Sequence, residues 1–166
     1  MCSSDLAVVD NQADFGITQL PVTEKRLQIA KIHADEIKAL FHPGHPLAKK
    51  ERITPQDLID VPLLLPKAGH TRSHLNTWLE PVEDQIVISM ELDSTEMLKR
   101  FTMAELGVGF VAGSHCREEV AAGRLVARPL GPESMLRQVG LIYRKDKALS
   151  KAALGFIEVK IGRAHV

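Results

Sequence analysis

The chain has 166 residues, enough for one domain or two small lobes, and its hydrophobic fraction of 45% permits a real core. Basic and acidic residues balance at 21 each and aromatic residues make up only 4%, which argues against a nucleic-acid-binding surface. No apolar run approaches the ~20 residues of a membrane span, and two cysteines do not make a disulfide scaffold, so we expect a cytoplasmic protein without membrane association.

The two ends of the chain can be encoded by DNA segments that are reverse complements of each other. Back-translated, residues 161–166 have a reverse complement that encodes the first residues of the chain, and the same string resembles a sequencing-adapter oligonucleotide. We therefore interpret residues 1–6 and 161–166 as non-native ends, and we exclude both from the reasoning about the fold. The natural chain is expected to extend beyond them.

The first part of the chain predicts a helix end followed by strands. Residues 7–9 are typical of the end of a helix, and residues 14–18 of a short buried strand that Pro21 closes. Residues 27–32 and 36–41 alternate in polarity, which predicts two further strands.

A compact helix-start signal follows at Thr54, where the capping hydroxyl is joined by a proline at position 55 and an acid at Asp57. Before residue 85 the sequence also predicts a buried strand at 61–65 and a helix that Thr71 or Ser73 caps and that runs to Leu79. After residue 111 it predicts a helix capped by Ser114, extended stretches at 125–129 and 138–143, and a last helix capped by Ser150.

Residues 85–111 predict a strand, a helix and a second strand. The β-branched beginning is typical of a buried parallel strand, and Asp93, Ser94 and Thr95 offer oxygens that can cap the helix. Gly107 is expected to end that helix in a left-handed conformation. The corner at Ser94 lies where open α/β sheets bind ligands, because free amides and the helix dipole favour anions there.

Six short motifs over residues 7–160 resemble the effector-binding domain of LysR-type transcriptional regulators. Each is weak alone, and their order makes the resemblance specific. They are Ala13-Asp-Phe-Gly-Ile17, His45-Pro-Leu-Ala48, Ile53-Thr-Pro-Gln-Asp-Leu58, Glu91-Leu-Asp-Ser94, Glu105-Leu-Gly-Val-Gly-Phe110 and Gly123-Arg-Leu-Val126.

The resemblance implies an α/β fold similar to type II periplasmic binding proteins, with two lobes and a ligand between them. Lobe I would comprise residues 7–34 and 123–160, and lobe II residues 35–122. Residues 27–34 and 124–129 would be the strands that connect the lobes.

The chain departs from the family in extent. Upstream of residue 7 it has no winged helix-turn-helix, no linker helix, and no first strand and helix of the effector domain, so the first lobe is expected to be incomplete. The resemblance implies small-molecule sensing in a bacterial regulator that acts as a homo-oligomer and touches DNA only through the missing domain. A periplasmic solute-binding protein of a transport system is the alternative, and an enzyme on a similar two-lobed fold is a third reading.

The candidate ligand contacts are hydroxyls and one cation near predicted helix starts. Thr71, Arg72 and Ser73 can give an anionic effector charge-assisted hydrogen bonds, although helix capping explains the hydroxyls equally well. The resemblance places a ligand contact near Thr71 and another near Thr18. Ser94 and Thr95 are also candidates, with capping as the competing role.

Other chemistry finds little support. His42 and His45, with His33, lack a further ligand at useful spacing, so no metal is expected. Cys116 follows His115 directly, and adjacent helical residues point in different directions, which disfavours a nucleophile–base pair. We expect no cofactor and no catalysis.

Overall fold

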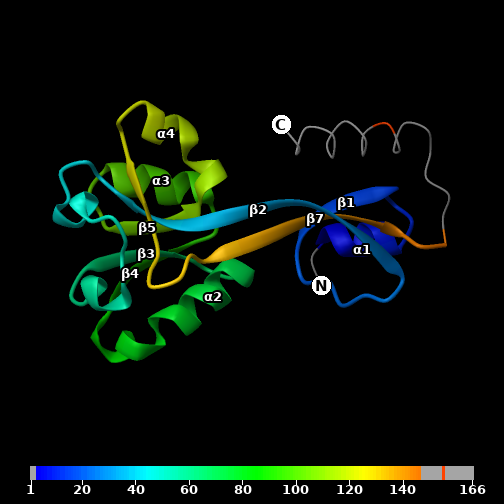
Figure 1. Ribbon diagram of the computed structural model, residues 1–166, viewed down its shortest axis with the longest axis horizontal. Coiled ribbons are helices and arrows are strands. Elements are labelled where there is room, and N and C mark those ends of the chain that lie inside the picture. The colour runs from blue at the N-terminus through cyan, green and yellow to red at the C-terminus, as the bar shows by residue number, and fades with distance from the viewer. Residues whose placement is uncertain (1–2, 147–154, 156–166) are drawn as a thin grey trace. The chain divides into compact units, whose positions relative to one another are not determined.

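The computed structural model describes residues 3–146 and residue 155, and these form two compact units (Figure 1). The first unit comprises the described residues of Met1–Ala34 and Arg137–Val166, and the second is Asp35–Leu136. Strand β2 (Leu27–Phe41) passes from the first unit into the second, and β7 (Leu136–Arg144) returns.

The first unit combines helix α1 (Ser3–Val9) with a small sheet. Strand β1 (Phe15–Gln19) pairs antiparallel with β7, and Ile17 lies opposite Leu141. Val8 and Val9 of α1 pack against the sheet in a small core with two further buried residues, Leu27 and Ile142. Residues 3–6, which sequence analysis excluded from the fold, form the first half of α1, where Asp5 is buried.

The second unit is built on a mixed sheet with the strand order β6-β2-β5-β3-β4. Its strands besides β2 are β3 (Pro62–Pro66), β4 (Val87–Leu92), β5 (Val108–Ala112) and β6 (Val126–Pro129). Strand β3 is parallel to both β4 and β5, whereas β2 is antiparallel to β5 and β6. The carboxyl ends of β3, β4 and β5 therefore share one edge of the sheet.

Helices cover both faces of this sheet (Figure 1). The longer ones are α2 (His70–Leu79) and α3 (Thr95–Met103), and α4 (Arg117–Ala121) is short. Leu75 and Leu79 of α2 share one core with Phe110, while Leu98 of α3 shares the other with Cys116. Four 3₁₀ turns complete the described part of this unit: η1 (Pro46–Lys49), η2 (Pro55–Leu58), η3 (Glu80–Gln85) and η4 (Gly113–His115).

The strand, helix and strand expected within residues 85–111 are confirmed as β4, α3 and β5, with two corrections. Strand β4 lies at the edge of the sheet, where β3 is its only partner among the described strands, and its Ile88 side chain is 43% exposed. Glu105, with a φ of 62°, takes the left-handed position after α3 that was assigned to Gly107. Gly107 is needed for space instead, since a Cβ there would lie 2.6 Å from the Pro62 carbonyl oxygen.

The boundary between the units also differs from the predicted lobes. Residues 123–136 belong to the second unit, because β6 pairs with the β2 segment around Ala39. The returning connection is thus β7, and the predicted crossing at 124–129 is wrong. The last predicted helix, capped at Ser150, lies outside the described residues apart from Gly155.

The helix start predicted at Thr54 is confirmed as η2. The Asp57 carboxylate accepts hydrogen bonds from the Thr54 backbone N–H and hydroxyl, both at 3.0 Å, and from Lys50 Nζ at 2.5 Å. Burial acts to raise the pKa of Asp57, but these hydrogen bonds outweigh it and lower the pKa.

Replacing Asp57 by alanine is expected to destabilise the protein by about 1–2 kcal/mol, because three donors lose their acceptor. Chemical denaturation at neutral pH measures the loss, with the exposed neighbour Gln56→Ala as the control. Equal stability of the two variants would contradict a stabilising role for the Asp57 carboxylate.

Candidate functional site

Helices α2 and α3 begin at the same edge of the second unit, the one formed by the carboxyl ends of β3 and β4. Strands β3 and β4 are parallel neighbours with Pro66 opposite Leu92, and a short turn leads from each strand into its helix. The turns are also tied together, because the Lys67 N–H donates to the Leu92 carbonyl at 3.0 Å. Since the first amides of a helix have no acceptor within it, the starts of α2 and α3 each present N–H donors at this edge.

Three predicted site residues lie in the first turn of α2. The helix starts at His70 with Gly69 as its N-cap, so the expected capping by Thr71 or Ser73 is wrong. Gly69 has a φ of 96°, a conformation that favours glycine. The Ser73 hydroxyl donates back to the Gly69 carbonyl at 3.3 Å, whereas Thr71 is half-buried.

Two further predicted residues begin α3. The exposed Ser94 is the N-cap, and its hydroxyl oxygen accepts from the Met97 N–H at 3.4 Å. Thr95 is the first residue of the helix and is half-buried. The structure thus gives Ser94 the capping role that sequence analysis weighed against ligand binding, and it places Thr95 at the same edge as Thr71.

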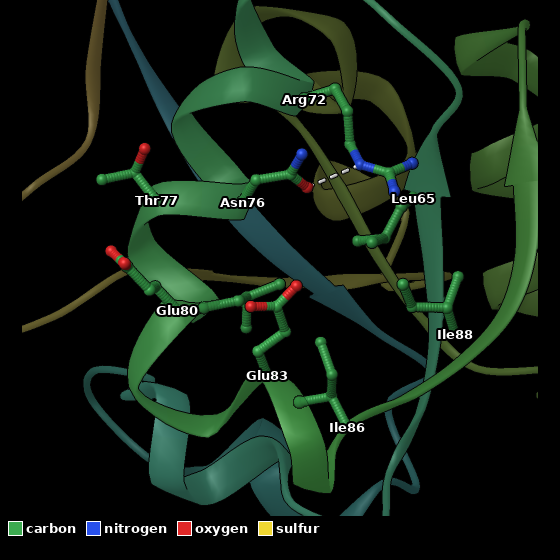
Figure 2. A pocket seen from close by; sticks show the side chains of 9 residues that line it. Leu65, Arg72, Asn76, Thr77, Glu80, Glu83, Ile86 and Ile88 are labelled. Atoms are coloured by element: carbon green, nitrogen blue, oxygen red, sulfur yellow. Dashed lines mark hydrogen bonds between the residues drawn. The ribbon is translucent and has the colours of Figure 1, made fainter.

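The Arg72 side chain is held by three groups of the chain, of which Figure 2 shows Asn76. Its Nε donates to Asn76 Oδ1 at 2.7 Å, its Nη1 donates to the Pro66 carbonyl at 2.9 Å, and Nη1 also forms an ion pair with Glu91. Only 15% of this side chain is exposed. Arg72 therefore does not point freely into solvent.

Asp35 of β2 is a buried carboxylate that the sequence did not indicate, and it lies beside the turn that follows β5. Asp35 accepts from the Ser114 hydroxyl at 2.5 Å, from the Ser114 N–H at 3.3 Å and from the Glu36 N–H at 3.0 Å. The Ser114 hydroxyl and N–H, which belong to the turn after β5, are thus already bound to a negative charge of the chain. Residues 35 and 114 are 79 positions apart, so no local pattern could have revealed the contact.

Thr18, the remaining predicted contact, belongs to the first unit. It is 6% exposed and lies within β1 opposite Gly140, inside the strand predicted at residues 14–18. Its neighbour Gln19 has a buried amide nitrogen, and within the described part of the chain this nitrogen has no hydrogen-bond partner. Gln19 is therefore a candidate donor that sequence analysis missed.

A pocket of about 550 Å³ runs beside α2, with Arg72 at one end (Figure 2). Ile86 and Ile88 form an apolar wall together with Leu65, and the Glu83 side chain lies toward the centre of the view. This pocket therefore has an apolar wall and acidic side chains, while the charge of Arg72 is neutralised by Glu91. The first turns of α2 and α3 therefore suit an anion better than this pocket does.

The histidine turn forms a smaller pocket of about 200 Å³ at the opposite ends of β3 and β5. His42 Nε2 lies 3.7 Å from Glu105 Oε1, and His45 Nδ1 accepts from the Leu47 N–H. Burial lowers the pKa of His45. Among residues 3–146 and residue 155, no group of three or more His, Cys, Asp or Glu side chains could hold a metal ion.

Cys116 is buried and has no partner cysteine in the described part of the chain. Burial raises the pKa of its thiol, which keeps the sulfur protonated and weakly nucleophilic. No described helix is long and apolar enough to span a bilayer.

Comparison with known sequences gives one consistent family. The sequence model for the LysR substrate binding domain matches residues 6–161. The HTH-type transcriptional regulator CbbR of Xanthobacter flavus is 33% identical over 123 residues, which are 69% of this chain and 36% of that protein. The RuBisCO operon transcriptional regulator of Acidithiobacillus ferrooxidans is 27% identical over 150 residues, covering 89% and 48%. The chain thus spans less than half the length of these relatives.

Solved structures agree on the fold. The CcmR regulatory domain of Synechocystis PCC6803, in complex with 2-PG, superposes with a TM-score of 0.83 at 19% identity, covering 97% of this chain and 78% of that one. HinK, a LysR family regulator from Pseudomonas aeruginosa, gives 0.81 at 17% identity, covering 96% and 55%. These likenesses confirm the expected two-lobed α/β fold, similar to type II periplasmic binding proteins.

Proposed function

The chain belongs to the LysR substrate binding domain family, and on that premise we propose that it senses a small-molecule effector for a bacterial transcription regulator. The observation that carries this proposal is the shared edge at which α2 and α3 begin, each after one of the neighbouring parallel strands β3 and β4. A domain that recognises a metabolite needs convergent polar donors on a rigid scaffold, and the parallel strands β3 and β4 provide that scaffold.

The effector is a small anion in this proposal. Backbone N–H groups at two helix starts, with the hydroxyl of Thr71, suit a carboxylate or phosphate group. Support comes from the CcmR regulatory domain, whose structure contains 2-PG, and from the QuiR effector-binding domain, whose structure contains shikimate. Thr18 is a further proposed contact of the first unit.

Regulation of transcription would require parts that lie outside this chain. In the proposal, the regulator is cytoplasmic and homo-oligomeric, and it contacts DNA through a separate domain. The relatives reported above are transcription regulators, which disfavours the transport alternative. We also propose that the domain has no catalytic role, in keeping with the raised pKa of the Cys116 thiol.

A ligand screen tests the proposal directly. Thermal unfolding of the chain would be followed with a panel of monocarboxylates, dicarboxylates and phosphate esters that includes shikimate and 2-PG. Saturating binding to the folded state raises the unfolding midpoint, and isothermal titration then gives the Kd. A panel without any stabilising anion would contradict the proposed effector class.

Replacing Thr71 by valine is expected to weaken binding of a stabilising anion by about 1–3 kcal/mol, because the side chain keeps its shape but loses a donor and acceptor. Thr77→Val is the matched control on the same helix, since Thr77 lies two turns along and its hydroxyl donates to the Ser73 carbonyl at 3.3 Å. Equal Kd values for the two variants would show that Thr71 does not contact the ligand.

A further inference from the structure

Arg72 joins three separate segments at the edge of the second unit. Its guanidinium reaches the Pro66 carbonyl at the end of β3 and the Glu91 carboxylate near the end of β4. It also reaches the Asn76 side chain one turn along α2, as Figure 2 shows. A planar guanidinium can serve such divergent acceptors together, whereas a lysine ammonium is a single point charge. The contact therefore depends on the shape of the arginine as well as on its charge.

The charges at this edge are already paired. Arg72 faces Glu91, and Lys67 Nζ lies 3.8 Å from the Asp93 carboxylate. The formal charges of these four side chains cancel. The first pair is the more enclosed one, because the Arg72 side chain is 15% exposed whereas those of Lys67 and Asp93 are 63% and 79% exposed.

We propose that Arg72 is a positioning residue, which holds the first turn of α2 against the ends of β3 and β4. This inference rests on the proposed function and refines it. The ligand is then recognised by uncharged donors, namely the first-turn amides and the Thr71 hydroxyl, and the Arg72–Glu91 pair keeps those donors in register. Such a site selects ligands by hydrogen-bond geometry more than by total negative charge.

The positioning role can be tested without any ligand. Hydrogen exchange of the amides at 73–76, which close the first turns of α2, would be compared in Arg72→Lys, Glu91→Gln and Lys67→Gln. We expect exchange to rise about tenfold in the first two variants, because local opening becomes easier, and to stay unchanged at α3. Lys67→Gln is the control, since its ion pair is exposed and is expected to matter little. Arg72→Lys with exchange equal to wild type would overturn the proposal.

Titration with 2-PG and shikimate separates positioning from direct contact. If Arg72 positions α2, then Arg72→Lys and Glu91→Gln both weaken binding of either probe by about tenfold, and the Arg72→Lys/Glu91→Gln double variant binds no more weakly than either single variant. If Arg72 contacts the ligand as a cation, Arg72→Lys retains affinity, and Glu91→Gln strengthens binding of the more highly charged 2-PG. That second pattern would overturn the proposal. Should wild type bind neither probe, the titration uses another anion that stabilises the chain in the ligand panel, and the proposed effector class fails only if no anion of the panel does so. Hydrogen exchange decides the role of Arg72 in either case.

Discussion

Replacing Glu119 by alanine is expected to destabilise the second unit by about 3 kcal/mol, because it leaves a buried ammonium without its main partner. Lys99 of α3 and Glu119 of α4 are 6% and 8% exposed, and Lys99 Nζ donates to Glu119 Oε1 at 2.8 Å. Glu96 also pairs with Lys99, but its side chain is 67% exposed and solvent screens it. Chemical denaturation measures the loss.

Two variants sharpen this test. Glu96→Ala removes the exposed partner and is expected to cost less than about 1 kcal/mol. The Lys99→Met/Glu119→Leu double variant removes both buried charges and is expected to recover much of the loss, because the desolvation cost disappears with the pair. A Glu119→Ala variant as stable as Glu96→Ala would contradict a dominant role for the buried partner.

The same pair predicts a dependence of stability on pH. The Lys99 hydrogen bond lowers the pKa of Glu119 in the folded state. A carboxylate with a depressed folded-state pKa stabilises the protein above its unfolded-state pKa, about 4.3 for glutamate, and that stability is lost as the pH falls through the lower folded-state pKa. The free energies of unfolding of wild type and Glu119→Gln should therefore converge as the pH is lowered from neutral to strongly acidic. A difference in the free energy of unfolding that stays constant with pH would contradict this linkage.

Phe110→Ala is expected to be the most damaging single truncation in the second unit, at about 3–5 kcal/mol. Phe110 is fully buried in β5, between β2 and β3, and its ring centroid lies 6.4 Å from that of Trp78 in an edge-on arrangement. Truncation removes the contacts between the sheet and α2 and leaves a cavity that strands on both sides prevent from closing. Thermal and chemical denaturation both report the effect.

The control for Phe110 is Val120→Ala in α4, where the side chain is 39% exposed and a cost below about 0.5 kcal/mol is expected. Phe110→Leu should fall between the two, because it keeps most of the apolar volume. Comparable losses for Phe110→Ala and Val120→Ala would show that the space between the sheet and α2 collapses after truncation.

Local signals explain what could be read from the chain before its fold was known. The turn at Thr54 was predictable because a cap, a proline and an acid act within four neighbouring residues. Strand β4, helix α3 and strand β5 were predictable because their apolar periodicity is intrinsic to residues 85–111. Ser94 as the cap of α3 follows from the same local chemistry, and the order of short motifs was enough to indicate the family.

Partner choice, by contrast, depends on contacts between distant residues. Residues 123–136 read as part of the first lobe until the pairing of β6 with β2 placed them in the second unit. Ile88 looks like a core residue in sequence, yet it is exposed in β4, which ends the order of the described strands. Arg72 looks like a free cation, but its partners come from β3 and β4. Sequence periodicity records which face of an element is apolar, whereas strand order and ion pairing arise only when separate segments meet in the folded chain.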